Sequence, residues 1–155
     1  MKRLTHIDAD GEARMVDVSA KPMQLRQAVA RGEIRLQKET LKLIETHSIA
    51  KGNVLATARV AGIQAAKKCG ELIPLCHPLP ITHCEVTFEI PKRRDRIVIT
   101  ASARIAAQTG VEMEALTAVS VAALTIYDMC KAVDKKMRIA DITLVSKTKS
   151  SVKGR

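Results

Sequence analysis

Alternating apolar and polar positions predict a β-hairpin in the middle of the chain. Every second residue from Cys84 to Ile90 is apolar, and the residues between them are polar or charged. A similar alternation recurs from Arg96 to Arg104. A period of two places one face of a strand against a core, so both segments are predicted strands. The short segment from Pro91 to Asp95 turns the chain between them, which makes the pair an antiparallel hairpin.

Two longer segments have the apolar spacing that is typical of helices. The first follows Asn53, a residue type that caps helices, and ends at the basic residues Lys67 and Lys68 before Gly70. The second runs from Val111 to Lys135, is rich in Ala, Leu and Met, and contains no Gly or Pro. We expect this second segment to be a buried central helix.

The remaining segments have weaker patterns. The spacing of their β-branched and apolar residues predicts short strands at 12–18, 34–36 and 137–145. It predicts a short helix at 39–46. Three prolines give the loop 73–80 a stiff, non-helical shape. We expect a mobile basic loop at about 19–33 and a mobile basic tail at about 146–155.

The order of these elements indicates the fold class. Strand, helix, hairpin, helix and strand form the β-α-β-β-α-β arrangement of the ferredoxin-like fold. We therefore predict an α+β protein with an antiparallel sheet and helices packed on one face. The extra segments before residue 53 are additions to this arrangement, and a length of 155 residues fits one domain covering 1–155.

The composition narrows the classes of ligand. The chain has 26 Lys and Arg against 16 Asp and Glu, which gives a net charge of +10. Phe88 and Tyr127 are its only aromatic residues, so it lacks the stacking platforms that bind single-stranded nucleic acids. The positive charge therefore suits the phosphates of a small polyanion at least as well as a nucleic-acid backbone. The core has to be built from Ala, Val, Ile, Leu and Met.

Membrane and secretory signals are not evident in the sequence. No apolar run approaches the roughly 18 residues of a membrane helix, and the first residues lack the apolar stretch of a secretory signal. We therefore expect a cytoplasmic protein. Its cysteines, at 69, 76, 84 and 130, are expected to be reduced thiols.

The predicted central helix carries a narrow polar stripe. At about 100° per residue, Glu114, Thr117, Thr125 and Asp128 fall on one side, and Lys131 borders them. One interpretation is an ordinary solvent face with Asp128 and Lys131 as a surface ion pair. The other is an acid/base site that faces a cleft, where a carboxylate and an ammonium group exchange protons.

Two loops are further candidates for chemistry. Prolines on both sides of Cys76 and His77 fix the direction of the imidazole, although a lone histidine is more often a structural hydrogen-bonding group. A zinc site with His83 and Cys84 is the less favoured alternative, because the spacing is not that of a Cys-x-x-Cys site. Lys51 precedes a helix and is either an anion ligand or a surface lysine. The sequence contains neither a P-loop nor a dinucleotide fingerprint.

Five segments resemble the cyclic pyranopterin monophosphate synthase family, the C proteins of molybdenum cofactor biosynthesis. The resemblance extends from about Leu4 to about Lys147 and is carried by motifs in the same order. These motifs are Leu4-Thr5-His6-Ile7, Met15-Val16-Asp17-Val18-Ser19, 51–59 (KGNVLATAR), 72–79 (LIPLCHPL), and 109–118 (TGVEMEALTA) continuing through 127–131 (YDMCK).

The resemblance implies an activity. Members of the family take 3′,8-cyclo-7,8-dihydro-GTP, a small molecule delivered by an upstream radical SAM enzyme. They rearrange it to cyclic pyranopterin monophosphate and release pyrophosphate by general acid/base catalysis. The resemblance implies no resident cofactor or metal, and it leaves open whether Mg²⁺ accompanies the triphosphate. It further implies a single catalytic domain, a homohexamer built as a trimer of dimers, and neither a nucleic-acid nor a membrane partner.

The resemblance also implies roles for particular residues. Asp128 resembles the catalytic acid/base, with Lys131 and Lys51 as its catalytic neighbours. Residues similar to substrate contacts are Leu75, Cys76, His77, Glu112, Met113 and Glu114, and those expected to close over the triphosphate are Lys21, Arg26 and Lys147. The competing hypothesis is a non-catalytic nucleic-acid-binding or scaffold protein that uses the +10 charge.

Overall fold

The computed structural model describes residues 10–152 and contains four strands and four helices within that range. The motif at Leu4 to Ile7 lies outside the described residues. In chain order the elements are β1 (Gln24–Arg35), α1 (Lys38–Glu45), α2 (Val54–Lys67), α3 (Cys69–Leu72), β2 (His83–Glu89), β3 (Arg96–Ala107), α4 (Glu112–Cys130) and β4 (Arg138–Ser151).

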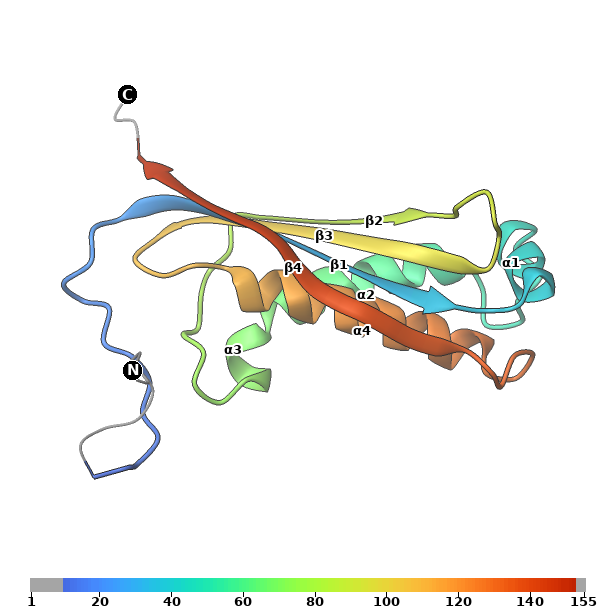
Figure 1. The fold of residues 1–155 in the computed structure, drawn as a ribbon, viewed down its shortest axis with the longest axis horizontal. Helices are drawn as coiled ribbons and strands as arrows, with labels where there is room; N and C mark the ends of the chain where they lie inside the picture. Colours follow the sequence, from blue (N-terminus) through green and yellow to red (C-terminus); the bar gives the residue numbers. More distant parts are fainter. Residues whose placement is uncertain (1–9, 153–155) are drawn as a thin grey trace.

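The four strands form one antiparallel sheet with the order β2-β3-β1-β4. Together with α2 and α4 they give the predicted β-α-β-β-α-β connectivity, and the ferredoxin-like prediction is confirmed. Figure 1 shows α2, α3 and α4 on one side of the sheet and α1 at one end of it. The hairpin of β2 and β3 and the helices α1, α2 and α4 also lie where the sequence pattern predicts them.

Small side chains bring α4 close to both the sheet and α2. The residues of α4 that are less than 2% exposed are mostly alanine, valine and isoleucine, namely Ala115, Ala118, Val119, Ala122, Ala123, Ile126 and Cys130. Phe88 and Tyr127 pack against this core but are only partly buried. The expected core of Ala, Val, Ile, Leu and Met is therefore confirmed, with Cys130 as a further member.

The largest departure from the sequence-based picture is β1. The segment expected to be a mobile basic loop is mostly strand and pairs with both β3 and β4 in the middle of the sheet. Its helix-facing positions are Ala28, Ala30, Gly32 and Ile34, and Ala and Gly are poor strand formers, so the pattern is weak in the sequence. A Cβ at Gly32 would lie 2.8 Å from Val119, so this glycine permits the close approach of α4.

The two chain ends also differ from expectation. The basic tail is strand as far as Ser151, because residues 146–151 pair with β1. The strand expected at 12–18 is wrong, since this segment holds an isolated bridge and no ladder. The strand at 34–36 is the end of β1 rather than a separate element. Pairing with a distant strand decides each of these outcomes, and local sequence does not record it.

Helix α4 ends at Cys130, earlier than the predicted Lys135. Its length and composition would allow it to cross a membrane, so the expectation that no such segment exists is wrong by this criterion. More than half of it is buried inside the fold, which is the behaviour of a core helix. Asp134, four residues after the end of α4, is also buried and is only 1% exposed.

Asp134 is expected to be one of the main stabilising residues of the fold. Its carboxylate accepts hydrogen bonds from the backbone of Gln37 (2.9 Å) and Lys136 (3.0 Å) and from the Thr40 hydroxyl (3.2 Å). Asp134→Ala leaves these donors without an acceptor, and we expect it to lower the free energy of unfolding by about 3 kcal/mol in urea denaturation. Asp141→Asn, at an exposed ion pair with Arg35, is the control and should cost less than about 0.5 kcal/mol. Equal effects would contradict this assignment.

Candidate functional site

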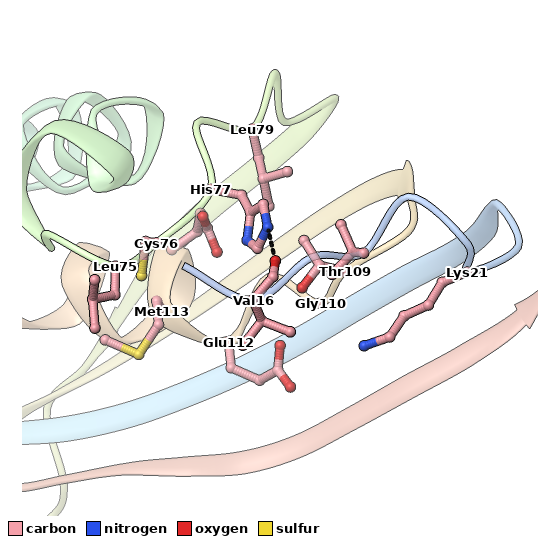
Figure 2. Close-up of a pocket in the computed structure, with 12 residues that line it drawn as sticks. Val16, Lys21, Leu75, Cys76, His77, Leu79, Thr109, Gly110, Glu112 and Met113 are labelled. Atoms are coloured by element: carbon pink, nitrogen blue, oxygen red, sulfur yellow. Dashed lines mark hydrogen bonds between the residues drawn. The ribbon is translucent and has the colours of Figure 1, made fainter. Parts of the chain in front are cut away.

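A cavity of about 410 Å³, here called the front cavity, lies at the N-terminal end of α4. The loop after α3, the segment before β1 and the start of α4 each form part of its wall. Figure 2 shows side chains from these segments converging on it. The predicted substrate-contact residues that line it are Lys21, Leu75, Cys76, His77, Glu112, Met113 and Glu114. The structure therefore brings together seven of the expected contacts.

A hydrogen bond fixes the His77 ring at the cavity wall. The ring Nε2 lies 2.8 Å from the carbonyl oxygen of Val16, so Nε2 carries the proton and donates it. This contact joins the proline-bounded loop to the segment before β1. The hydrogen bond therefore holds the imidazole in one orientation at the end of the stiff loop.

Burial changes the ionisation of the groups deepest in the front cavity. Glu114 is only 3% exposed, and burial raises the pKa of its carboxyl, with the charge of Glu112 adding to the effect. Burial also raises the pKa of the Cys76 thiol, and the nearby charge of Glu114 raises it further. The Cys76 thiol therefore stays protonated at neutral pH and is not an activated nucleophile.

A smaller cavity of about 230 Å³, the basic cavity, adjoins the front cavity through the shared residues Gly110 and Glu112. Strands β1 and β4 supply its cationic side chains, Arg26, Lys147 and Lys149. Arg26 pairs with Lys149 in the sheet register, and Lys147 is two residues earlier, so all three share one face of the sheet. The N-terminus of α4 adds the positive end of its dipole nearby.

One atom of the basic cavity has its hydrogen-bonding capacity unused. Among the described residues, the Nε of Arg26 is the buried side-chain nitrogen or oxygen that has no partner. The same guanidinium donates from another nitrogen to the carbonyl of Gln108 at 3.0 Å, which fixes its orientation. Lys147 contacts Glu112 at 3.1 Å. The cavity therefore combines three cations with one carboxylate, a composition suited to a phosphate-bearing ligand.

The second group of candidate residues lies at the opposite end of α4. Asp128 bonds to Lys51 (2.8 Å) and to Lys131 (2.7 Å), one lysine on each carboxylate oxygen. Lys51 also donates to the backbone carbonyl of Asp128 at 2.9 Å. We call these three residues the Asp128 cluster. Its members are about half exposed, so the cluster lies on the surface of a single chain.

The two lysines decide the protonation of Asp128. Lys131, and after it Lys51, lowers the pKa of the Asp128 carboxyl to about 2. The carboxylate in turn raises the pKa of Lys131. At neutral pH the Asp128 carboxylate is therefore an anion held between two lysine side chains.

The pH dependence of this cluster can be measured directly. The pKa of Asp128 lies below the ordinary 3.8, so both ion pairs are fully formed above about pH 4 and are lost as the pH falls through 2. In ¹³C NMR titrations we expect the Asp128 carboxyl to titrate near pH 2, and at clearly higher pH in Lys131→Ala. Lys135→Ala should leave the titration unchanged. An Asp128 that titrates near 3.8 in the wild type would refute the pairing.

The two groups of residues are far apart in one chain. Sixteen residues separate Glu112 from Asp128 on a continuous helix, which at 1.5 Å per residue is about 24 Å. The front and basic cavities lie at one end of this distance and the Asp128 cluster at the other. A single chain therefore cannot bring all the expected site residues to one small molecule.

The structure separates the two interpretations of the polar stripe on α4. Glu114 and Thr117 are buried, so the stripe is not a solvent face at its N-terminal end. At its C-terminal end Asp128 is exposed and forms the predicted pair with Lys131, joined by Lys51. The outward stripe of α4 is instead partly apolar, with Met113 37% and Leu124 57% exposed.

Sequence reasoning missed several residues at the cavities. The front cavity is also lined by Val16, Val18, Leu79, Thr109 and Gly110, and the basic cavity by Lys149. Lys149 could have been found from the sequence, because Lys147 and Lys149 alternate as residues on one face of a strand do, in the segment expected to be a mobile tail. All four cysteines are free thiols. Within residues 10–152, no three His, Cys, Asp or Glu side chains gather in a way that would hold a metal ion.

The fold and the cavities together define a class of protein. It is a ferredoxin-like α+β protein with one cationic cavity, an adjoining cavity lined by carboxyl groups, and a separate cluster of one carboxylate and two lysines. A model of the MoaC family matches residues 15–150, and the chain belongs to the MoaC family.

Similar curated proteins agree with this membership. A cyclic pyranopterin monophosphate synthase from Roseiflexus sp. (strain RS-1) is 57% identical over 148 residues, which cover 96% of this chain and 94% of the relative. A protein of the same name from Parvibaculum lavamentivorans is 56% identical, covering 95% of this chain and 92% of the relative. Another from Chloroflexus aurantiacus is 59% identical, covering 93% and 88% respectively. The resemblance noted in the sequence motifs is confirmed.

Proposed function

We propose that this protein is a cyclic pyranopterin monophosphate synthase of molybdenum cofactor biosynthesis. It converts 3′,8-cyclo-7,8-dihydro-GTP to cyclic pyranopterin monophosphate and releases pyrophosphate, which makes it a lyase. The observation that carries the proposal is the pair of adjoining cavities at the N-terminus of α4, one basic and one lined by carboxyl groups and His77. Identity of 55% or more to relatives of that name supports it.

The basic cavity is the part of the site suited to the triphosphate. Arg26, Lys147 and Lys149 provide cations there, and Lys21 faces the adjoining front cavity. In Figure 2, Lys21 extends toward the Glu112 carboxylate from the segment before β1. An incoming phosphate competes with that carboxylate for the lysines, and the buried Arg26 Nε supplies a free donor. We propose that these four side chains neutralise the charge of the triphosphate and of the pyrophosphate that leaves.

The front cavity is the part suited to the guanine-derived ring. The rearrangement of this substrate consists of proton transfers around a polyanion and needs no electron transfer. Glu114 offers a carboxyl group at the cavity wall, and His77, whose Nε2–H is engaged by the Val16 carbonyl, offers its other ring nitrogen. We propose that Leu75, Cys76 and Met113 orient the ring while these polar groups bind its edge.

The Asp128 cluster supplies the proton-transfer groups in this proposal. Lys51 and Lys131 donate protons, and Asp128 holds them 2.7–2.8 Å away and accepts a proton in return. Because the cluster is about 24 Å from Glu112 along α4, we propose that it acts on substrate held by a second copy of the chain. Two α4 helices packed antiparallel, with a twofold axis near Ser120, would place each Asp128 beside the partner's front cavity.

The outward stripe of α4 supports this assembly. Met113 and Leu124 flank Ser120 on the same side of the helix and are exposed in the single chain. A small residue at the midpoint allows two helices to approach closely, and the apolar residues on either side would be buried by the contact. We propose that such dimers assemble three at a time into a homohexamer.

The remaining features of the proposal follow from the substrate. The chain is expected to work in the cytoplasm, on a small molecule delivered by a radical SAM enzyme. It needs no resident cofactor, and Mg²⁺ enters only as a companion of the triphosphate. Neither nucleic acid nor membrane is a partner in this proposal.

The deciding experiment mixes the purified protein with enzymatically prepared 3′,8-cyclo-7,8-dihydro-GTP. We expect pyrophosphate and a fluorescent pterin derivative to appear in equal amounts, and Mg²⁺ is varied in parallel. GTP itself is the control substrate and should give neither product. Absence of both products would refute the function, and tight, salt-sensitive binding of a DNA or RNA duplex in that case would favour the charge-driven alternative.

A further inference from the structure

We propose that Cys69 and Gly70 are positioning residues that hold the loop 75–77 at a fixed distance from α4. In doing so they set the width of the front cavity and therefore the fit of its ligand. The ligand named below rests on the proposed function, but the geometry does not. Neither residue lines the front cavity, so both act through the loop.

The end of the loop leads into Leu79, which lies between two cavities. The front cavity is on one side, and a rear cavity of about 240 Å³, bounded by Gly70, Pro78 and Pro80, is on the other. Glu114 lines both cavities, so the wall between them is thin. A segment with space on both sides is positioned by few contacts, and those contacts decide where it lies.

Gly70 provides the closest of these contacts. A Cβ built at Gly70 would lie 2.9 Å from the Cα of Pro78, 3.1 Å from its nitrogen and 3.2 Å from the carbonyl oxygen of His77. All three atoms belong to the backbone, so no side-chain rotation relieves the clash. Any larger residue at position 70 therefore displaces the His77–Pro78 peptide away from α3.

Cys69 attaches the same short helix to α4. Its thiol is buried and lies 3.5 Å from the Thr117 hydroxyl, one helical turn after Glu114. Burial raises the pKa of the Cys69 thiol to about 11, so it is a neutral hydrogen-bonding group. The Cys69 carbonyl accepts from Ile73, and the Ile73 carbonyl accepts from Cys76. A chain of contacts thus runs from α4 through α3 to the loop.

The position of His77 depends on this chain of contacts. The other end of the loop is held by the bond from His77 to Val16, and the ring cannot keep its 2.8 Å contact if the peptide behind it moves. Displacement of about 1 Å in a binding group is enough to cost up to 100-fold in catalytic efficiency. The Asp128 cluster is at the other end of α4 and should not be affected.

Gly70→Ala tests the proposal with two independent measurements. We expect KM for 3′,8-cyclo-7,8-dihydro-GTP to rise at least tenfold, with kcat changed less than threefold. The substrate-free measurement is alkylation of Cys76, which should become at least threefold faster because the loop moves away from α3, while Cys84 keeps its rate. Gly32→Ala, whose added methyl group meets the side chains of Val119 and Ile142 rather than the backbone of the loop, is the control for crowding and should change both values much less.

Cys69 variants test the second contact. Cys69→Ser keeps a hydrogen-bonding group beside Thr117 and should retain a KM within threefold of wild type, whereas Cys69→Val should raise KM about tenfold. A folded Gly70→Ala with wild-type KM and alkylation rate, or an equal response in Gly32→Ala, would overturn the proposal. If the wild type does not turn over this substrate, the proposed function fails, and the alkylation rates still decide whether the loop is held as described.

Discussion

Asp128→Asn should lower kcat/KM by about 10³-fold, the range expected for loss of a group that takes part in proton transfer. The amide removes the negative charge between Lys51 and Lys131, which then repel each other and lose their common anchor. The side chain is more than half exposed, so we expect almost no change in melting temperature. Steady-state release of pyrophosphate measures the first value and calorimetry the second.

A matched variant separates this effect from a general loss of surface charge. Asp141→Asn also removes an exposed carboxylate that pairs with a basic side chain, Arg35, on the sheet. Its turnover should equal that of the wild type. Asp128→Asn with turnover within threefold of wild type would show that the cluster is an ordinary surface ion pair.

Two inactive variants should restore activity when they share an assembly. Asp128→Asn lacks the carboxylate that we propose to transfer protons, and Glu112→Gln alters the opposite end of α4. If each site combines the Asp128 cluster of one chain with the cavities of another, a mixed dimer contains one intact site and one doubly altered site. Co-expression of differently tagged chains should therefore recover about a quarter of wild-type turnover, from random pairing across a twofold interface.

The control for this experiment uses two changes at the same end of the helix. Glu112→Gln and Glu114→Gln both lie at the front cavity, so no mixed dimer contains an unaltered site. Their co-expression should recover no activity. Equal recovery in the two pairings, or none in either while mixed assemblies are isolated by their tags, would refute the composite site.

The fold could be predicted where local pattern and tertiary packing agree. The alternation around Val86 and the helical spacing before Gly70 each correspond to one buried face, so their elements appear as expected. In β1 the buried face is built from Ala28, Ala30 and Gly32, whose small side chains fit the closely packed α4 but carry little strand signal. Such a strand is recognisable only once its partners are known.

The candidate site shows a similar division. The resemblance assigned nine of the residues that line the two cavities. His77, Glu114 and Asp128 could be assigned because they lie in distinctive local sequences. Their grouping could not be predicted, since it depends on the length of α4 and on the β1–β4 register that brings Lys147 toward Arg26. Assignment of site residues by resemblance therefore did not indicate that they form two separate groups in each chain.

Helix α4, which connects the cavities to the Asp128 cluster, limits which insertions and deletions the chain can tolerate. Insertion of one residue in α4 between Glu114 and Asp128 would shift one group by about 1.5 Å and rotate it by about 100° relative to the other. In the proposed dimer both chains carry the insertion, so the Asp128 cluster would be displaced from the partner's front cavity at both sites. Length changes should therefore be tolerated in the β2–β3 turn, at residues 91–95, and not in α4. The number of residues in α4 sets the distance between the two groups of site residues.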